Sequence, residues 1–226
     1  MWGNRNGDGD GSSDRDFAAA RERLVDRLAA RGDVERESTL AALRAVPRHE
    51  FVPESRRDHA YEDRPLPIGA GQTISAPHMV AIMTDALALD PGDRVLEIGT
   101  GCGYHAAVTA EAVGEAGAVY SVEYESELAA EARERFDCLG YDVDVRVGDG
   151  HEGWPEHAPY DAAYLTCAPS AVPDAIVEQV HPGGRVLAPV GTARQRLVRL
   201  TRRADGSVAE EDLGGVRFVT MQGTGD

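Results

Sequence analysis

The stretch that most constrains the fold of this chain is residues 94–104, which read RVLEIGTGCGY. An apolar strand that runs into Gly-x-Gly turns sharply and brings its backbone close to any ligand bound there. The helix expected next, over residues 104–113, directs its free N–H groups at the same place. This combination predicts a nucleotide-type cofactor site, although a plain tight turn would use the same glycines.

The glycine spacing and two nearby acids narrow the choice of cofactor. The dinucleotide fingerprint has a third glycine three positions after the second, where this chain has Tyr104. Glu97 would repel a pyrophosphate but suits a ligand with an ammonium and a sulfonium, as in S-adenosylmethionine. Glu123, at the end of the next strand, can accept both hydroxyls of a ribose, as it also would for NAD. We therefore expect S-adenosylmethionine, with a nicotinamide cofactor as the weaker alternative.

Strands and helices alternate along most of the chain. The expected strands cover residues 94–98, 118–123, 143–147, 162–165 and 185–190, and the intervening helices cover residues 104–113, 127–139 and 172–180. This alternation predicts an α/β fold with a doubly wound, mostly parallel sheet and ligands beyond the carboxyl ends of its strands. Segments 196–201 and 216–221, around Asp205-Gly206, predict a C-terminal antiparallel hairpin.

The front of the chain differs in composition from the rest. Residues 1–16 are nearly all Gly, Asp, Asn, Ser and Arg, which predicts a disordered tail. Residues 17–226 are expected to form a single domain, in which helices over 17–31 and 37–46 and a turn-rich stretch over 51–71 precede the sheet. No apolar run has the length of a signal peptide or a membrane span, so a cytoplasmic protein is expected.

The charge balance and the cysteines exclude several classes of protein. The net charge is −16, and all 23 basic residues are arginine. An acidic, lysine-free chain suggests adaptation to high salt, although a GC-rich genome would also favour arginine. The charge argues against nucleic-acid binding. Cys102, Cys138 and Cys167 are scattered and the histidines show no ligand spacing, so we expect no disulfide framework and no metal. We also expect a monomer.

Several ordered motifs outside the glycine loop carry a family resemblance. They are VPRHEFVP at residues 46–53, YED at 61–63, GQTISAPHM at 71–79, GDG at 148–150 and QVHPGGR at 179–185. With them the chain resembles the protein-L-isoaspartate O-methyltransferase family over nearly everything but the tail, and the segment 71–79 is the most specific match. The resemblance implies methylation of the free α-carboxylate of isoaspartyl residues in damaged proteins, with no nucleic-acid or membrane partner.

The resemblance also implies roles for particular residues. Ser75 would be the catalytic residue that orients the acceptor carboxylate. The cofactor would be held by Gln72, Thr73, Ile74, Ser75, Glu97, Gly99, Gly101, Glu123, Tyr124, Asp149 and Gly150. The substrate would meet Thr73, Ser75, Thr166, Cys167, Ala168 and Val219. From the residues alone, Ser75 also fits an N-cap for the helix that carries Pro77 in its first turn, and Asp149 fits an ordinary turn aspartate.

Four positions depart from the family pattern. Thr220 and Met221 stand where relatives commonly have Pro-Leu, Val80 where some carry a cofactor-contacting histidine, and Cys167 where alanine is usual. These departures leave two alternatives open. One is a methyltransferase of the same fold with another acceptor, such as a small acid or an RNA base; the other is a cofactor-binding homologue without catalysis.

Overall fold

A seven-stranded sheet forms the centre of the molecule. The computed structural model describes residues 10–224, with side chains from residue 16 onward. The strands of this sheet are β3 (Arg94–Ile98), β4 (Ala118–Glu123), β5 (Val143–Val147), β6 (Tyr160–Leu165), β7 (Val180–Val190), β8 (Gln195–Arg202) and β9 (Val208–Val216). Their order is β5-β4-β3-β6-β7-β8-β9, parallel from β5 to β7 and antiparallel from β7 to β9. The predicted doubly wound sheet with an antiparallel end is confirmed.

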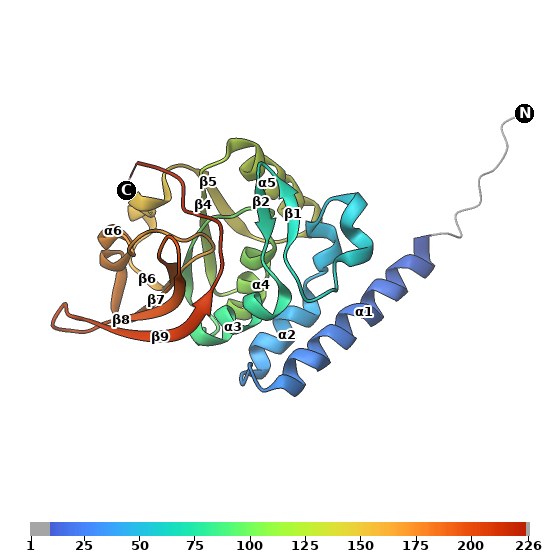
Figure 1. Ribbon diagram of the computed structural model, residues 1–226, viewed down its shortest axis with the longest axis horizontal. Helices are drawn as coiled ribbons and strands as arrows, with labels where there is room; N and C mark the ends of the chain where they lie inside the picture. Colours follow the sequence, from blue (N-terminus) through green and yellow to red (C-terminus); the bar gives the residue numbers. More distant parts are fainter. Residues whose placement is uncertain (1–9, 225–226) are drawn as a thin grey trace, which may run out of the picture.

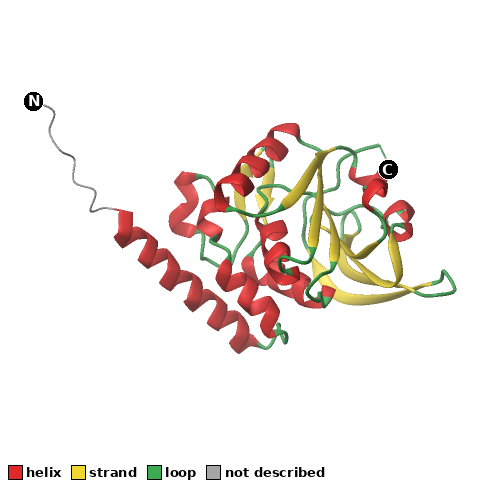
Figure 2. Cartoon of the chain, turned by 180° about the vertical axis from the view of Figure 1, so that it is seen from behind, coloured by secondary structure: helices red, strands yellow, loops and turns green. Residues whose placement is uncertain are grey.

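Helices cover both faces of this sheet (Figures 1 and 2). The α-helices are α1 (Asp10–Arg31), α2 (Glu37–Ala45), α3 (Pro77–Leu87), α4 (Tyr104–Val113), α5 (Ser126–Leu139) and α6 (Asp174–Glu178). Short 3₁₀ helices are η1 (Arg48–Phe51), η2 (Glu54–His59), η3 (Gly150–Glu152) and η4 (Pro155–His157), and a small hairpin joins β1 (Leu66–Gly69) to β2 (Gln72–Ile74). Figure 1 shows α1 along the outside of α2, at the end of the molecule opposite the β8–β9 hairpin.

Two apolar cores hold the layers together, one on each face of the sheet. The larger core joins Leu28 of α1, Leu43 of α2 and Leu87 of α3 to α4 and to one face of the sheet. The smaller one packs Tyr160 and Ile176 against the opposite face. Burial of these side chains supplies the main drive for folding, at about 25 cal/mol per Å² of apolar surface.

The strand order places a ligand site at one edge of the sheet. From β3 the chain moves to β4 on one side, whereas β6, which is the other neighbour of β3, leads away to β7. The connections after β3 and β6 therefore diverge and leave a crevice at the carboxyl ends of these strands. The glycine loop lies in this crevice.

The structure confirms the predicted C-terminal hairpin but corrects the bounds of its second strand and of helix α6. The second strand of the hairpin covers Val208–Val216, whereas residues 217–221 run on toward the crevice. The tight Asp205-Gly206 turn requires the returning strand to start at once, and this exposed edge strand is too polar to show an apolar pattern. Helix α6 begins after Pro173 and not at residue 172, because a proline disfavours helical backbone at the residue before it.

The structure also corrects the predicted disordered tail. Residues 10–16 begin helix α1, and residues 1–9 lie outside the described residues. Part of the predicted disordered tail, residues 10–16, is therefore helical, and for residues 1–9 disorder stays a prediction.

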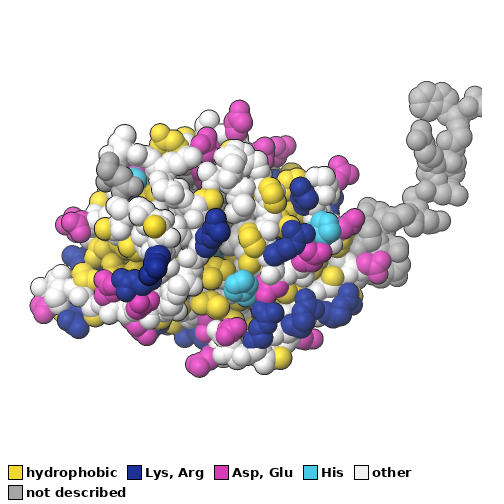
Figure 3. Space-filling model, in the orientation of Figure 1, with side chains coloured by type: hydrophobic (Ala, Val, Ile, Leu, Met, Phe, Trp, Pro, Cys, Tyr) yellow, Lys and Arg dark blue, Asp and Glu magenta, His cyan; other side chains and the backbone are white. Residues whose placement is uncertain are grey.

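The charges are mixed rather than segregated on the face shown in Figure 3, where arginines along α1 and near the C-terminal hairpin alternate with Asp and Glu. Among residues 10–224, no helix has the length and apolar character needed to cross a membrane.

Candidate active site

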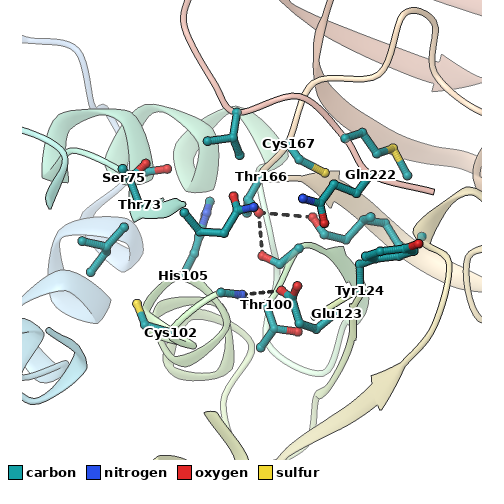
Figure 4. A pocket seen from close by; sticks show the side chains of 18 of the residues that line it. Thr73, Ser75, Thr100, Cys102, His105, Glu123, Tyr124, Thr166, Cys167 and Gln222 are labelled. Atoms are coloured by element: carbon teal, nitrogen blue, oxygen red, sulfur yellow. Dashed lines mark hydrogen bonds between the residues drawn. The ribbon is translucent and has the colours of Figure 1, made fainter. Parts of the chain in front are cut away.

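A cavity opens at the carboxyl ends of β3, β4 and β6 and encloses about 750 Å³, including its mouth. Figure 4 shows Thr73 and Ser75 on one side of it, Glu123 and Tyr124 across from them, and Thr166, Cys167 and Gln222 above. Most of the predicted site residues line it, namely Gln72, Thr73, Ile74, Ser75, Gly99, Gly101, Glu123, Tyr124, Gly150, Thr166, Cys167 and Val219. The folded chain thus brings together segments that are up to 147 residues apart in sequence.

The glycine loop forms the floor of the cavity. Gly99 has a φ of 94°, and a Cβ at this position would collide with the Thr166 hydroxyl, which donates a hydrogen bond of 2.5 Å to the Gly99 carbonyl. Only glycine satisfies both restrictions. Tyr104, which argued against a dinucleotide site, lies 5.7 Å from the Phe51 ring and 4.7 Å from the Arg48 guanidinium carbon, and so anchors helix α4 in the core.

Glu123 lies where the sequence predicted, at the end of β4 and against the cavity. One carboxylate oxygen accepts from Gly101 N–H at 2.8 Å, and the other accepts from Glu125 N–H at 3.0 Å. Each carboxylate oxygen can accept a second hydrogen bond. Glu123 is therefore fixed in orientation while it keeps one acceptor site on each oxygen for a diol.

Glu97 occupies a different position from the one the sequence implied. It is fully buried below the loop and is not part of the cavity lining. Strand register places Ser121 and Tyr164 on either side of it, and their hydroxyls donate to its two oxygens at 2.5 and 2.9 Å. Burial raises its pKa to about 8, although both hydrogen bonds oppose the rise. In this position Glu97 does not contact a ligand in the cavity directly.

Hydrogen-bonded hydroxyl groups connect Glu97 with the cavity wall. The Ser121 hydroxyl also lies 2.6 Å from the Thr100 hydroxyl, and either of these two hydroxyls can be the donor. Thr100 lines the cavity, and its hydroxyl keeps at least one acceptor lone pair for a ligand in either arrangement. Thr100 can therefore accept from a cationic group in the cavity, which is the role that the sequence gave to Glu97.

Asp149 also differs from its expected role beside a base. Its Oδ1 accepts from the backbone and ring N–H of His151, and its Oδ2 accepts from the backbone and hydroxyl of Thr224. Asp149 is not part of the cavity lining, whereas the neighbouring Gly150 is. The alternative of a turn aspartate therefore describes the local geometry better.

Ser75 lines the cavity but does not cap helix α3. The N-cap is Ala76, because the residue before Pro77 is held in extended backbone, and no side chain caps from that position. The Ser75 carbonyl accepts at 2.7 Å from Arg48, a fully buried arginine that also donates to the Ala60 carbonyl at 2.9 Å. Burial lowers the pKa of Arg48. Arg48 thus fixes the backbone that carries the Ser75 hydroxyl.

The opposite wall is formed by the end of β6 and the C-terminal segment. Ala168 does not line the cavity; its N–H donates to the Val219 carbonyl at 2.8 Å, and its carbonyl accepts from Met221 N–H at 2.9 Å. Cys167 does line it, and burial raises the pKa of its thiol to about 12. Cys167 is consequently a neutral thiol at pH 7.

The sequence is similar to that of known proteins over most of its length. A family model described as protein-L-isoaspartate(D-aspartate) O-methyltransferase (PCMT) matches residues 19–225. The chain belongs to this family. It is 52% identical over 209 residues to protein-L-isoaspartate O-methyltransferase 2 of Archaeoglobus fulgidus, covering 92% of this chain and 95% of that one. It is 50% identical over 213 residues to the Methanopyrus kandleri protein-L-isoaspartate O-methyltransferase, covering 93% and 94%.

One solved structure agrees with this family, and a second shares the fold. A protein-L-isoaspartate O-methyltransferase with 34% identity superposes with a TM-score of 0.82 over 90% of this chain, which spans 66% of that chain's length. A Plasmodium falciparum β-aspartate methyltransferase (PCMT), in complex with S-adenosyl-L-homocysteine, has 24% identity and a TM-score of 0.79, covering 89% and 98% of the two chains. The second likeness concerns the fold alone.

Sequence reasoning missed several residues of this methyltransferase cavity. They are Val80, Ile98, Thr100, Cys102, Tyr104, His105, Val122, Thr220, Met221 and Gln222. His105 had a usable signal, because it stands in the first turn of the helix after the glycine loop. Its Nε2 lies 3.2 Å from the Thr84 hydroxyl, its ring centroid lies 4.3 Å from that of Tyr164, and burial lowers its pKa to about 3. It is therefore neutral at pH 7. Among the described residues, no group of three or more His, Cys, Asp or Glu could hold a metal ion.

Proposed function

We propose that this protein methylates the free α-carboxylate of L-isoaspartyl residues in damaged proteins, with S-adenosylmethionine as the methyl donor. Membership of the protein-L-isoaspartate O-methyltransferase family supports this function. The observation that carries the proposal is that one cavity joins the family-specific Gln72–Ile74 strand and Ser75 to the glycine loop and Glu123. A donor and an acceptor held by these two halves would meet inside that cavity.

The residues present fit this cofactor. Gly99 leaves no side chain between the backbone and a ligand, and Glu123 keeps two acceptor positions for the hydroxyls of a ribose. The Thr100 hydroxyl faces the cavity as an acceptor and suits the ammonium of the methionine end. When bound, S-adenosylmethionine supplies an electrophilic methyl group on its sulfonium.

The chain's own residues need only position the acceptor and exclude water. The ordinary pKa of an α-carboxyl group is about 3.5, so the acceptor is ionised at pH 7 and no strong general base is required. Ser75 donates a hydrogen bond that orients this carboxylate. The neutral Cys167 thiol does not compete as a nucleophile, because the thiolate is the reactive form. Orientation of this kind contributes roughly 7 to 11 kcal/mol in favourable intramolecular reactions.

The repair follows from the chemistry of the product. The methyl ester of an isoaspartyl residue cyclises without help to a succinimide, and the succinimide hydrolyses partly to normal aspartate. The protein therefore needs no site for the later steps.

The test is transfer of a labelled methyl group from S-adenosylmethionine to an isoaspartyl peptide and to its aspartyl twin. Base-labile label on the isoaspartyl peptide alone is expected, because only that linkage leaves an α-carboxylate free. Label on neither peptide, with the cofactor still bound, would favour another acceptor or a homologue without catalysis.

We also propose that the protein works as a monomer in a reducing cytoplasm at high salt. Its three cysteines are free, which suits a reducing compartment, and its acidic, lysine-free composition suits a salty one. Activity measured from low to molar salt, with size-exclusion chromatography at each salt concentration, tests the salt requirement and the monomeric state. Full activity at low salt or a stable dimer would contradict them.

A further inference from the structure

The last described residues form a strap over the cavity. Residues 217–224, which we call the strap, leave β9 and cross the carboxyl edge of the sheet toward the end of β5 (Figure 1). Near its start, the Gln195 side chain accepts from Phe218 N–H at 2.6 Å and donates to the Phe218 carbonyl at 3.1 Å. In the middle, Ala168 pairs with the strap through its N–H and its carbonyl. Two anchors thus hold the first half of the strap.

The middle of the strap is a wall of the cavity. Residues 219–222 all line it, and Met221 is buried there. The glycine loop and Glu123 line the same cavity from the sheet. A ligand held by Glu123 is therefore enclosed between the sheet and the strap, so its release depends on how firmly the far end of the strap is held.

Asp149 holds that far end. Its Oδ2 accepts from Thr224 N–H at 2.8 Å and from the Thr224 hydroxyl at 2.9 Å, while His151 engages Oδ1 through two N–H groups. Burial opposes ionisation of Asp149, but these hydrogen bonds outweigh it and hold its pKa well below the ordinary range. The ionised carboxylate is thereby fixed by His151 in the orientation that receives Thr224.

Gly223 provides a second, independent sign that this contact is built into the chain. Its φ of 132° is a backbone conformation that residues with a side chain rarely adopt, and a Cβ at this position would collide with the Asp149 carboxylate. The strap can approach Asp149 only because residue 223 is glycine. Thr224 is exposed, whereas Ala168 is buried, so the Asp149 contact is the anchor most readily opened to solvent.

We propose that Asp149 is a positioning residue that latches the strap through Thr224, and that opening this latch controls release of the nucleoside product. The proposal rests on the proposed function in that the enclosed ligand is S-adenosylmethionine or its product, S-adenosylhomocysteine. It gives Asp149 a task other than direct contact with the adenine. The latched strap also fixes Val219 and Thr220 on the acceptor side of the cavity, so one contact couples product release to the shape of the peptide site.

The experiment uses Gly223→Ala, whose Cβ would collide with the Asp149 carboxylate, and Thr224→Val, which removes the hydroxyl hydrogen bond to Asp149 and keeps the one from the backbone N–H. Gly214→Ala is the matched control, because Gly214 also has a positive φ, 110°, but nothing lies within 4 Å of a Cβ built there. Two quantities are measured on each full-length variant. They are the amide hydrogen exchange of residues 219–224 without ligand and the dissociation rate of S-adenosylhomocysteine by stopped-flow displacement.

Both latch variants should accelerate strap exchange and dissociation on the order of tenfold relative to the control, as expected for loss of a hydrogen bond to a charged group. Unchanged exchange and dissociation in both variants would overturn the latch. So would weaker binding in Asp149→Asn alone, since Asp149 would then act on the ligand directly. The exchange measurement involves no ligand or methyl acceptor, so failure of the proposed function leaves it interpretable.

Discussion

Burial of the Glu97 carboxyl group predicts how the free energy of unfolding changes with pH. Burial raises its pKa to about 8 in the folded protein, against an ordinary value of 4.5. The folded protein therefore keeps a proton that the unfolded chain has already released. The contribution of Glu97 to stability is fully present below pH 4.5 and is lost as the pH rises toward 8. At about 1.4 kcal/mol per pH unit, the loss between pH 5 and pH 8 is roughly 3 kcal/mol.

Glu97→Gln removes this titration with little change in shape. The amide oxygen can accept from one of the hydroxyls of Ser121 and Tyr164, and the amide nitrogen can donate to the other. The free energy of unfolding, measured by urea denaturation at pH 5, 6, 7 and 8, should fall less steeply in the variant. The difference between variant and wild type should grow by roughly 3 kcal/mol in favour of the variant from pH 5 to pH 8.

The control is Glu134→Gln, at an exposed position on helix α5. It should follow the wild-type profile at every pH. If the Glu97→Gln curve also runs parallel to wild type, Glu97 is ionised in the folded protein and the account of its burial is wrong.

Three further substitutions test the site itself. Ser75→Ala should lower kcat while leaving the Kd for S-adenosylmethionine within a few fold, and an unchanged rate would remove Ser75 from the mechanism. Glu123→Ala should weaken cofactor binding in calorimetry on the order of tenfold or more, because two hydrogen bonds to a charged group are lost; an unchanged Kd would refute the ribose assignment. Arg48→Met should cost about 2 to 5 kcal/mol in urea denaturation, since it leaves two buried carbonyls unpaired, and it should lower kcat by freeing the backbone of Ser75. Normal kcat in a folded Arg48→Met protein would show that this support is unnecessary.

Local patterns predicted the centre of the fold well. The bounds of β3 and α4 agree with the prediction, because an apolar strand, a glycine turn and a helix start are all written within eleven consecutive residues. Glu123 could likewise be placed, since the end of a parallel strand fixes the edge of the sheet at which its side chain lies. These features depend on neighbours in sequence.

The features that escaped prediction depend on partners distant in sequence. Glu97 is surrounded by Ser121 and Tyr164 because of the register of three strands, which no local pattern encodes. Asp149 meets Thr224, 75 residues later, only after the chain has crossed the sheet edge. The path of the strap was misassigned for a related reason: two of its apolar residues, Val219 and Met221, line the cavity instead of continuing a strand.

Methyl transfer should initiate repair of isoaspartyl linkages, and the fate of a single isoaspartyl peptide shows whether it does. An isoaspartyl peptide would be incubated with the protein and S-adenosylmethionine, and its isoaspartyl, succinimide and aspartyl forms would be separated over time. The account predicts that the isoaspartyl form declines and the aspartyl form accumulates through the succinimide, only when both protein and cofactor are present. An isoaspartyl peptide that persists unchanged, while the protein binds the cofactor normally, would contradict the claim.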